Sequence, residues 1–171
     1  MTILSHANNG GALINITVDI SDLQVTNDPN AILVTYALGS CIAVMLYDPR
    51  LKVAGMIHYM LPSSKTNPEK AAVQPAMFAD TGVPLLFESM YAFGCRKEQL
   101  IVKVAGGGKL YEDNGIFDIG RRNYTVLRKL FWKNNIMIAS EDVGGSKSRT
   151  ARLFTNDGRV VVSSQGEESE L

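Results

Sequence analysis

Short apolar runs alternate with turn signals in the first third of the chain. Ala31 to Tyr36, Cys41 to Tyr47 and Val53 to Met60 are rich in β-branched and apolar residues, which is typical of strands. Gly39-Ser40 separates the first two runs, and Asp48-Pro49 opens the turn between the second and the third. The pattern predicts three successive strands, of which the last two form a hairpin.

Further along the chain, apolar residues recur at the spacing of helices. One such stretch runs from Val83 to Met90, in a helix that we expect to begin near Asp80 or Thr81, since either can cap its first N–H groups. A second helix is predicted from about Gly120 to Lys133. The remaining predictions are a loop over Leu61 to Ala79, strands over Leu100 to Ala105 and Ile136 to Ala139, and a hairpin of Arg152 to Thr155 with Arg159 to Ser163 around Asn156-Asp157-Gly158.

These elements favour an α+β fold. We expect a single-domain α/β sandwich with a mostly antiparallel β-sheet and two main helices packed on it. The 171 residues fit one domain, and no linker divides them. We further expect a mobile N-terminal segment at 1–14, the domain at 15–164 and an acidic mobile tail at 165–171.

Composition narrows the class of function. Lys plus Arg equals Asp plus Glu at 17 each, so no net field favours nucleic acid or an anionic membrane. We expect a cytoplasmic protein that is not membrane-embedded, because the chain shows neither a secretory signal nor an apolar span of about 20 residues. Two Cys and two His at scattered positions make a zinc site improbable, so we expect no metal and no cofactor.

Cys41 and His58 form the candidate chemical pair. If the hairpin turns between Pro49 and Arg50, paired residue numbers sum to 99 and Cys41 faces His58 on one side of the sheet. A thiolate–imidazolium pair would then lower the thiol pKa and supply a nucleophile for acyl chemistry. N–H groups of the turn at Gly39 and Ser40 could face an oxyanion beside the sulfur.

A structural role also suits both residues. A small cysteine in an apolar strand is commonly inert core, and a lone histidine in such a strand is commonly a hydrogen-bonded structural residue. The residues by themselves leave both interpretations open.

Beyond these patterns, most of the chain, from about Ala31 to Val162, resembles the CheD family of chemoreceptor glutamine deamidases. The resemblance rests on the order and spacing of many short motifs. They are Val34-Thr35, Leu38-Gly39-Ser40-Cys41, Tyr47-Asp48-Pro49, Gly55-Met56-Ile57-His58, Met60-Leu61-Pro62, Phe78-Ala79-Asp80-Thr81, Ala105-Gly106-Gly107, Ile119-Gly120, Arg122-Asn123, Glu141-Asp142 and Gly144-Gly145.

This resemblance implies a Cys-His-Thr triad: Cys41 as nucleophile, His58 as general base and Thr35 as the residue that orients His58. It implies a protein-glutamine glutaminase that acts on chemoreceptor cytoplasmic domains through a cysteine thioester, with glutamate methylesterase as a side activity. A CheC-type phosphatase is the implied partner. Two alternatives remain at this point: a non-catalytic CheD-like regulator of such a phosphatase, and a general cysteine amidase or peptidase.

Overall fold

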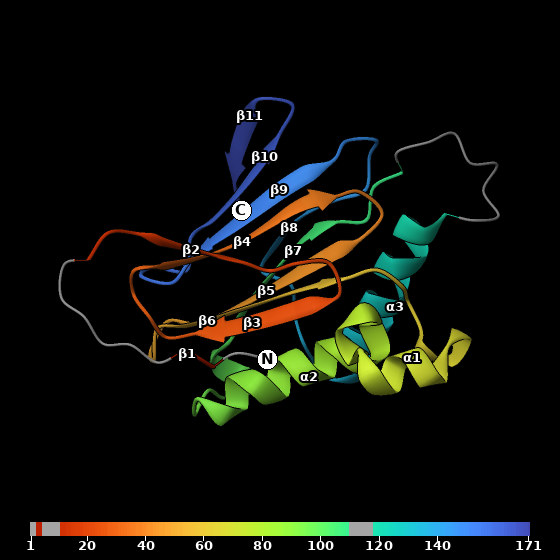
Figure 1. Ribbon diagram of the computed structural model, residues 1–171, viewed down its shortest axis with the longest axis horizontal. Helices are drawn as coiled ribbons and strands as arrows, with labels where there is room; N and C mark the ends of the chain where they lie inside the picture. Colours follow the sequence, from red (N-terminus) through yellow and green to blue (C-terminus); the bar gives the residue numbers. More distant parts are fainter. Residues whose placement is uncertain (1–2, 5–10, 110–117) are drawn as a thin grey trace.

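Two stacked β-sheets and a layer of helices make up the protein, seen here in a computed structural model that describes residues 3–4, 11–109 and 118–171 (Figure 1). The six-stranded sheet has the order β1-β3-β6-β5-β7-β8, and the five-stranded sheet has the order β11-β10-β9-β4-β2. Most neighbouring strands are antiparallel; β1 with β3, β2 with β4 and β7 with β8 are parallel. The strands are β1 (Ile3–Leu4), β2 (Ile14–Thr17), β3 (Asp22–Thr26), β4 (Ala31–Leu38), β5 (Ile42–Asp48), β6 (Val53–Tyr59), β7 (Ile101–Gly106), β8 (Ser140–Val143), β9 (Arg149–Phe154), β10 (Val160–Ser164) and β11 (Glu167–Glu170).

Two main helices, α2 (Ala79–Ala92) and α3 (Ile119–Lys133), cover one face of the six-stranded sheet (Figure 1). Shorter elements precede and follow α2: η1 (Ser64–Thr66), α1 (Pro68–Val73), η2 (Pro75–Met77) and η3 (Lys97–Gln99). The α+β sandwich with two main helices is therefore confirmed, with two sheets where one was expected. No helix in the described part of the chain is long and apolar enough to cross a membrane.

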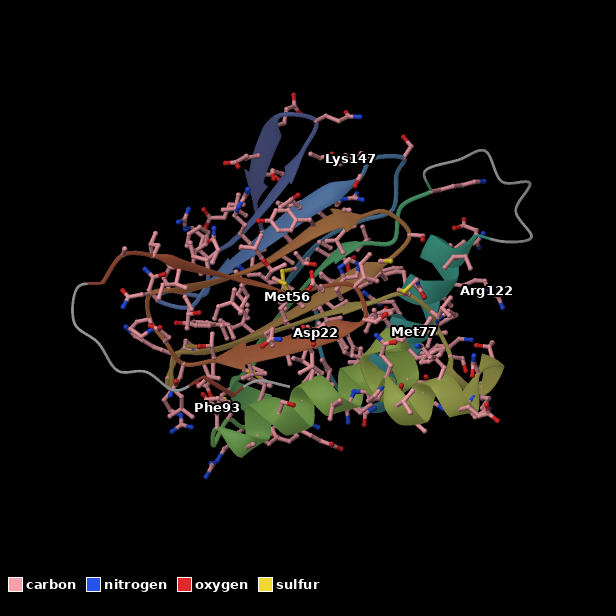
Figure 2. All side chains as sticks on the ribbon, in the orientation of Figure 1. Asp22, Met56, Met77, Phe93, Arg122 and Lys147 are labelled. Atoms are coloured by element: carbon pink, nitrogen blue, oxygen red, sulfur yellow. The ribbon has the colours of Figure 1, made fainter. Side chains whose placement is uncertain are left out.

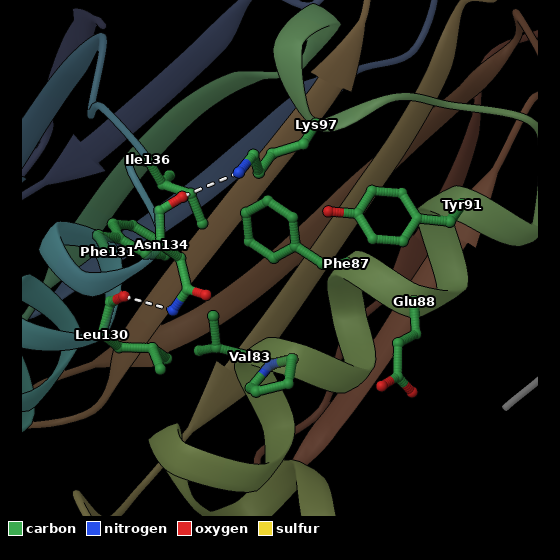
Figure 3. Close-up of a pocket in the computed structure, with 10 residues that line it drawn as sticks. Val83, Phe87, Glu88, Tyr91, Lys97, Leu130, Phe131, Asn134 and Ile136 are labelled. Atoms are coloured by element: carbon green, nitrogen blue, oxygen red, sulfur yellow. Dashed lines mark hydrogen bonds between the residues drawn. The ribbon is translucent and has the colours of Figure 1, made fainter.

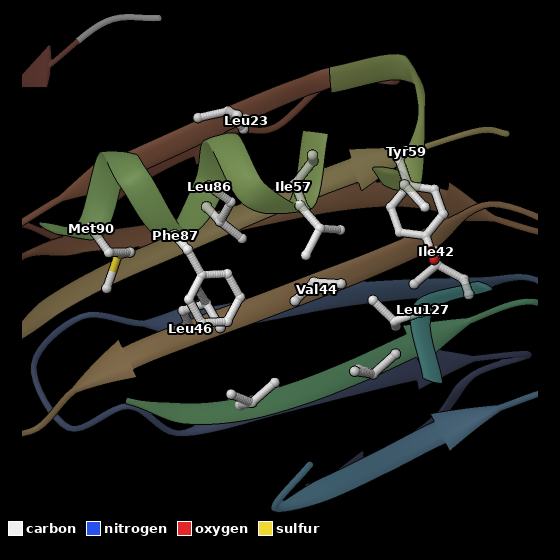
Figure 4. Packing of buried hydrophobic residues seen from close by; sticks show 14 of the residues in the cluster. Leu23, Ile42, Val44, Leu46, Ile57, Tyr59, Leu86, Phe87, Met90 and Leu127 are labelled. Carbon is white, nitrogen blue, oxygen red and sulfur yellow. The ribbon is translucent and has the colours of Figure 1, made fainter. Parts of the chain in front are cut away.

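Two apolar clusters hold the three layers together. The first lies between the six-stranded sheet and the helices, where Ile42 and Ile57 meet Leu86 and Leu127 (Figure 4). The second lies between the two sheets, where Met56 projects from β6 (Figure 2). Strands β5 and β6 contribute to both clusters on alternate residues, which explains why all of their side chains are buried.

Two of the predicted elements are wrong. Ile136 to Ala139 is not a strand: Ile136 and Ile138 pack against the first cluster and Met137 is exposed, but the ladder with β7 begins at Ser140, after a single hydrogen bond from the Ala139 N–H to the Val102 oxygen. The predicted loop over 61–79 contains α1, which Pro68 begins at a position where a missing N–H costs nothing. The side chain of Asn67 caps this helix by accepting from the N–H of Lys70.

The start of α2 lies near the predicted position, but the predicted cap is wrong. The helix begins at Ala79, and its N-cap residue Phe78 makes no side-chain cap. Asp80 instead accepts hydrogen bonds from the N–H and hydroxyl of Ser64, at 2.8 and 2.9 Å. The carboxylate therefore holds the preceding segment against α2.

Both chain ends were expected to be mobile. Residues 1–2 and 5–10 of the first segment lie outside the described residues, while 167–170 of the acidic tail form β11 and pair with β10. Lys103 Nζ also donates to the carbonyl oxygen of Leu171 at 2.6 Å. The division into 1–14, 15–164 and 165–171 remains a prediction.

Candidate active site

A kinked turn between β4 and β5 carries Gly39, Ser40 and Cys41. The β4–β9 register shifts between Thr35 and Leu38, and Ala37 takes a left-handed conformation with φ of 55°. This bulge turns the chain out of the five-stranded sheet, so that the next strand enters the other sheet. Cys41 lies just before β5 and is partly exposed.

Three consecutive carbonyl groups fix this turn. The Gly39 oxygen accepts from the N–H of Gly108 at 2.7 Å, and the Cys41 oxygen accepts from the N–H of Gly107 at 2.8 Å. Between them, the Ser40 oxygen accepts from Nδ2 of Asn123 at 2.9 Å. The approach of β7 needs glycine, because a Cβ on Gly106, whose φ is 111°, would overlap the Cys41 carbonyl oxygen.

His58 lies in β6 opposite Ala43, so paired residue numbers sum to 101, and the predicted pairing with Cys41 is wrong. The turn is wider than expected, with Asp48 paired to Val53. One carboxylate oxygen of Asp48 accepts the N–H groups of Arg50 and Leu51, at 2.9 and 3.0 Å, which stabilises this wider turn.

A two-residue shift leaves the face of a strand unchanged. Cys41 therefore lies diagonally from His58 across the hairpin, on the side that faces the second sheet. Ala43, between them on this side, belongs to the cluster between the sheets, and Cys41 packs against that cluster. His58 is fully buried, so the partly exposed thiol is the more accessible of the two.

Thr35 connects His58 to the second sheet. Its hydroxyl lies 2.8 Å from Nδ1 of His58 and donates to the carbonyl oxygen of Val18 at 2.7 Å. A hydroxyl has one proton, so it must accept from Nδ1–H of the imidazole. The lone pair of His58 is thereby placed on Nε2, which is buried and has no hydrogen-bond partner among the described residues.

Burial keeps both members of the Cys–His pair neutral. It raises the pKa of the Cys41 thiol, an effect that a hydrogen bond from the cysteine's own backbone opposes. Burial also lowers the pKa of His58 to about 4, although the charge of Asp19 opposes this change. The expected thiolate–imidazolium pair with a lowered thiol pKa is therefore wrong for the resting site.

Two other features are less suited to chemistry. Cys95 is buried, and its burial together with the nearby carboxylate of Asp48 raises the pKa of its thiol to about 12. An apolar groove between α2 and α3 is lined by residues such as Phe87 and Leu130 and contains neither Cys nor His (Figure 3). Among the described residues, no group of three or more His, Cys, Asp or Glu could hold a metal ion.

Comparison with known proteins places the chain in a family. Residues 60–164 match the family described as CheD chemotactic sensory transduction. The chain is 52% identical to "Probable chemoreceptor glutamine deamidase CheD 2" of Anaeromyxobacter dehalogenans, over 91% of this chain and 98% of that one. It is also 52% identical to "Probable chemoreceptor glutamine deamidase CheD 1" of Syntrophus aciditrophicus, over 89% and 95%. It is 45% identical to "Probable chemoreceptor glutamine deamidase CheD" of Solibacter usitatus, over 91% and 92%. The chain belongs to the CheD family.

The lowered pKa of His58 predicts a specific loss of stability in acid. Between pH 6.5 and about 4, the unfolded chain binds a proton at His58 that the folded chain does not, so the free energy of unfolding falls as the pH falls. This group should remove about 2 kcal/mol between pH 7 and pH 4.5. Urea denaturation at both pH values would measure the loss.

The variant His58→Gln provides the control. It retains the other acid-sensitive groups, such as Asp142, whose pKa the hydrogen bond from Arg149 lowers. Its stability should therefore fall less than that of the original protein. An equal fall in both proteins would contradict a neutral buried His58.

Proposed function

We propose that this protein is a chemoreceptor glutamine deamidase, which converts glutamine side chains of chemoreceptor cytoplasmic domains to glutamate. The relatives at 52% identity carry this activity in their names and match almost the whole chain. The observation that carries the proposal is the hydrogen-bond chain from His58 through Thr35 to Val18. It leaves Nε2 as a base on the face of the sheet where the Cys41 thiol lies.

In the proposed mechanism, Cys41 Sγ attacks the carboxamide carbon while Nε2 of His58 takes the thiol proton. The resulting oxyanion accepts hydrogen bonds from the N–H groups of Ser40 and Cys41 in the turn that begins at Gly39. His58 then returns its proton to the departing nitrogen, the C–N bond breaks, and ammonia leaves a thioester on Cys41. Water, deprotonated by His58, hydrolyses the thioester to glutamate and the free thiol.

A methyl ester of glutamate would form the same thioester, with methanol as the leaving group. Glutamate methylesterase activity therefore follows as a side activity of the same residues. No step in either reaction calls for a cofactor. The proposed setting is the cytoplasm, where the receptor domains that serve as substrate lie.

Cys41→Ala should abolish the release of ammonia from purified receptor cytoplasmic fragments, because it removes the nucleophile. Cys95→Ala is the matched control, since it also removes a thiol but leaves the turn between β4 and β5 intact. Ammonia release by Cys41→Ala at the original rate would contradict a thioester mechanism. Activity on small amides with none on receptor fragments would favour a general cysteine amidase.

Thr35→Val should lower kcat about 10-fold, because the imidazole loses a hydrogen bond of ordinary strength that selects its tautomer. The loss should be smaller than for His58→Gln, which removes a general base and should cost at least about 100-fold. Thr35→Ser keeps the hydroxyl and is the control. Equal kcat values for Thr35→Val and Thr35→Ser would mean that the hydroxyl does not orient His58.

We also propose a CheC-type phosphatase as a partner that covers the turn where the Cys41 thiol is partly exposed, an expectation that rests on the family resemblance. If the two ligands share one site, receptor fragment and phosphatase should each raise the apparent Kd of the other in proportion to concentration. Titrations with Cys41→Ala protein would measure this competition. A plateau in the shift, or a stable ternary complex, would indicate separate sites. Phosphatase binding without ammonia release from the original protein would favour the non-catalytic regulator.

A further inference from the structure

Asn123 is a polar residue on the buried side of α3. It is fully buried and lies in line with Gly120, Leu127 and Phe131, the other buried residues of the helix. Its Nδ2 donates to the Ser40 oxygen at 2.9 Å and to the Met60 oxygen at 2.8 Å. One amide group thus bridges the turn before Cys41 and the chain just after β6.

The two contacts fix which way the amide points. Both neighbours are carbonyl oxygens, so Nδ2 must face them, and Oδ1 faces away with no hydrogen-bond partner among the described residues. A buried acceptor without a partner costs about 1–3 kcal/mol. The same amide supplies the donor for two carbonyl oxygens, so an apolar residue at this position would leave both the Ser40 and the Met60 oxygen without it.

The planar peptide bond links the Ser40 carbonyl to the Cys41 N–H. In a planar trans peptide, the C=O of one residue and the N–H of the next point in opposite directions. The bond from Asn123 to the Ser40 oxygen therefore sets the direction of the Cys41 N–H. In the same way, the bond from Gly108 to the Gly39 oxygen sets the direction of the Ser40 N–H.

These two N–H groups are available to a ligand. In the described part of the chain, neither Ser40 N–H nor Cys41 N–H donates to a backbone or side-chain oxygen. The Cys41 N–H belongs to the same residue as Sγ and therefore lies close to the sulfur, where it opposes the rise in the thiol pKa that burial causes. An oxyanion formed by attack of Sγ would arise in the same place.

Other contacts already fix the residues on either side of the Ser40–Cys41 peptide. The β5–β6 ladder holds Ile42 against Tyr59, and Gly107 and Gly108 bind the carbonyl groups on either side of Ser40. The Ser40–Cys41 peptide is the part of the turn whose orientation depends on a side chain. That side chain is Asn123.

We propose that Asn123 is a positioning residue that holds the Ser40–Cys41 peptide so that the Cys41 N–H stabilises the oxyanion of the reaction. This inference rests on the proposed deamidase function. It predicts an effect on acyl transfer, which forms an oxyanion, and little effect on alkylation of the same thiol by iodoacetamide, which forms none. Alkylation still depends on Cys41 and His58.

The test compares both reactions in Asn123→Leu, which has a similar volume and no donor. We expect kcat for ammonia release from receptor fragments to fall about 10- to 100-fold, at or below the loss found for removing an oxyanion donor. The KM and the rate of Cys41 alkylation should stay within about threefold. Tyr59→Phe is the matched control, because it removes the bond from the Tyr59 hydroxyl to the Asn123 backbone oxygen, 3.0 Å long, and leaves the amide in place.

Tyr59→Phe should keep kcat within about threefold. Parallel losses of kcat and alkylation rate in Asn123→Leu, or no loss of kcat, would overturn the proposal. A loss in Tyr59→Phe equal to that in Asn123→Leu would also overturn it, because anchoring of the helix would then be the cause.

Asn123→Ala serves as a second variant, and both variants must keep a cooperative thermal transition. If neither folds, Asn123 is a residue of the fold and the proposal is wrong. If the original protein releases no ammonia, the deamidase function fails and this inference fails with it. If the original protein does release ammonia, a loss of kcat without a loss of alkylation rate therefore tests the role of Asn123 alone.

Discussion

The single proton of the Thr35 hydroxyl constrains the whole candidate site. Because the hydroxyl donates its proton in a hydrogen bond to the Val18 carbonyl oxygen, it can only accept from Nδ1 of His58. This requirement selects one tautomer of the imidazole. Thr35 belongs to the five-stranded sheet and His58 to the six-stranded sheet. The packing of the two sheets against each other therefore sets the tautomer of His58, and the cluster around Met56, which lies between the sheets, contributes to the site in this way.

The site also requires the backbone of α3 to pack closely against the end of β7. A Cβ on Gly120 would overlap the carbonyl groups of Gly107 and Gly108, so α3 reaches the end of β7 only because position 120 lacks a side chain. That approach brings Asn123, one turn further along α3, to the Ser40 carbonyl. The absence of a side chain at Gly120 therefore lets α3 come close to β7, and this short distance allows the hydrogen bond from Asn123 to Ser40.

Periodicity predicted the strands and helices around the site but not the contacts between them. It placed Cys41 and His58 on one face of a hairpin. The two residues do share a face, because the register error was two residues and side chains in a strand repeat every two residues. The error itself came from the Asp48 carboxylate, whose hydrogen bonds widen the turn in a way that apolar spacing does not reveal. The false strand at 136–139 has alternating burial, but within the described residues its contact with β7 is limited to the hydrogen bond from the Ala139 N–H to the Val102 oxygen, and the ladder starts at Ser140.

The long-range partners were harder to predict. Thr35 entered only through the family resemblance, since its contacts with Val18 and His58 join segments that no local pattern relates. Asn123 left a signal that could have been used: it is a polar residue on the apolar stripe of a predicted helix. Such a residue must find hydrogen-bond partners, and in a helix near a glycine-rich strand end the backbone is the nearest source.

A neutral resting pair also explains why a hydroxyl can serve where other hydrolases use a carboxylate. A carboxylate in place of Thr35 would add a buried charge and stabilise the imidazolium, which would raise the pKa of His58 from about 4. Threonine fixes the tautomer without charge, so the fully buried Thr35–His58 pair needs no counter-ion at rest. In the proposed mechanism, the imidazolium forms only while Sγ attacks, when the developing oxyanion supplies the opposite charge close by. Stabilising that oxyanion with the Cys41 N–H thus also lowers the cost of protonating His58, which couples the turn before Cys41 to the base on β6.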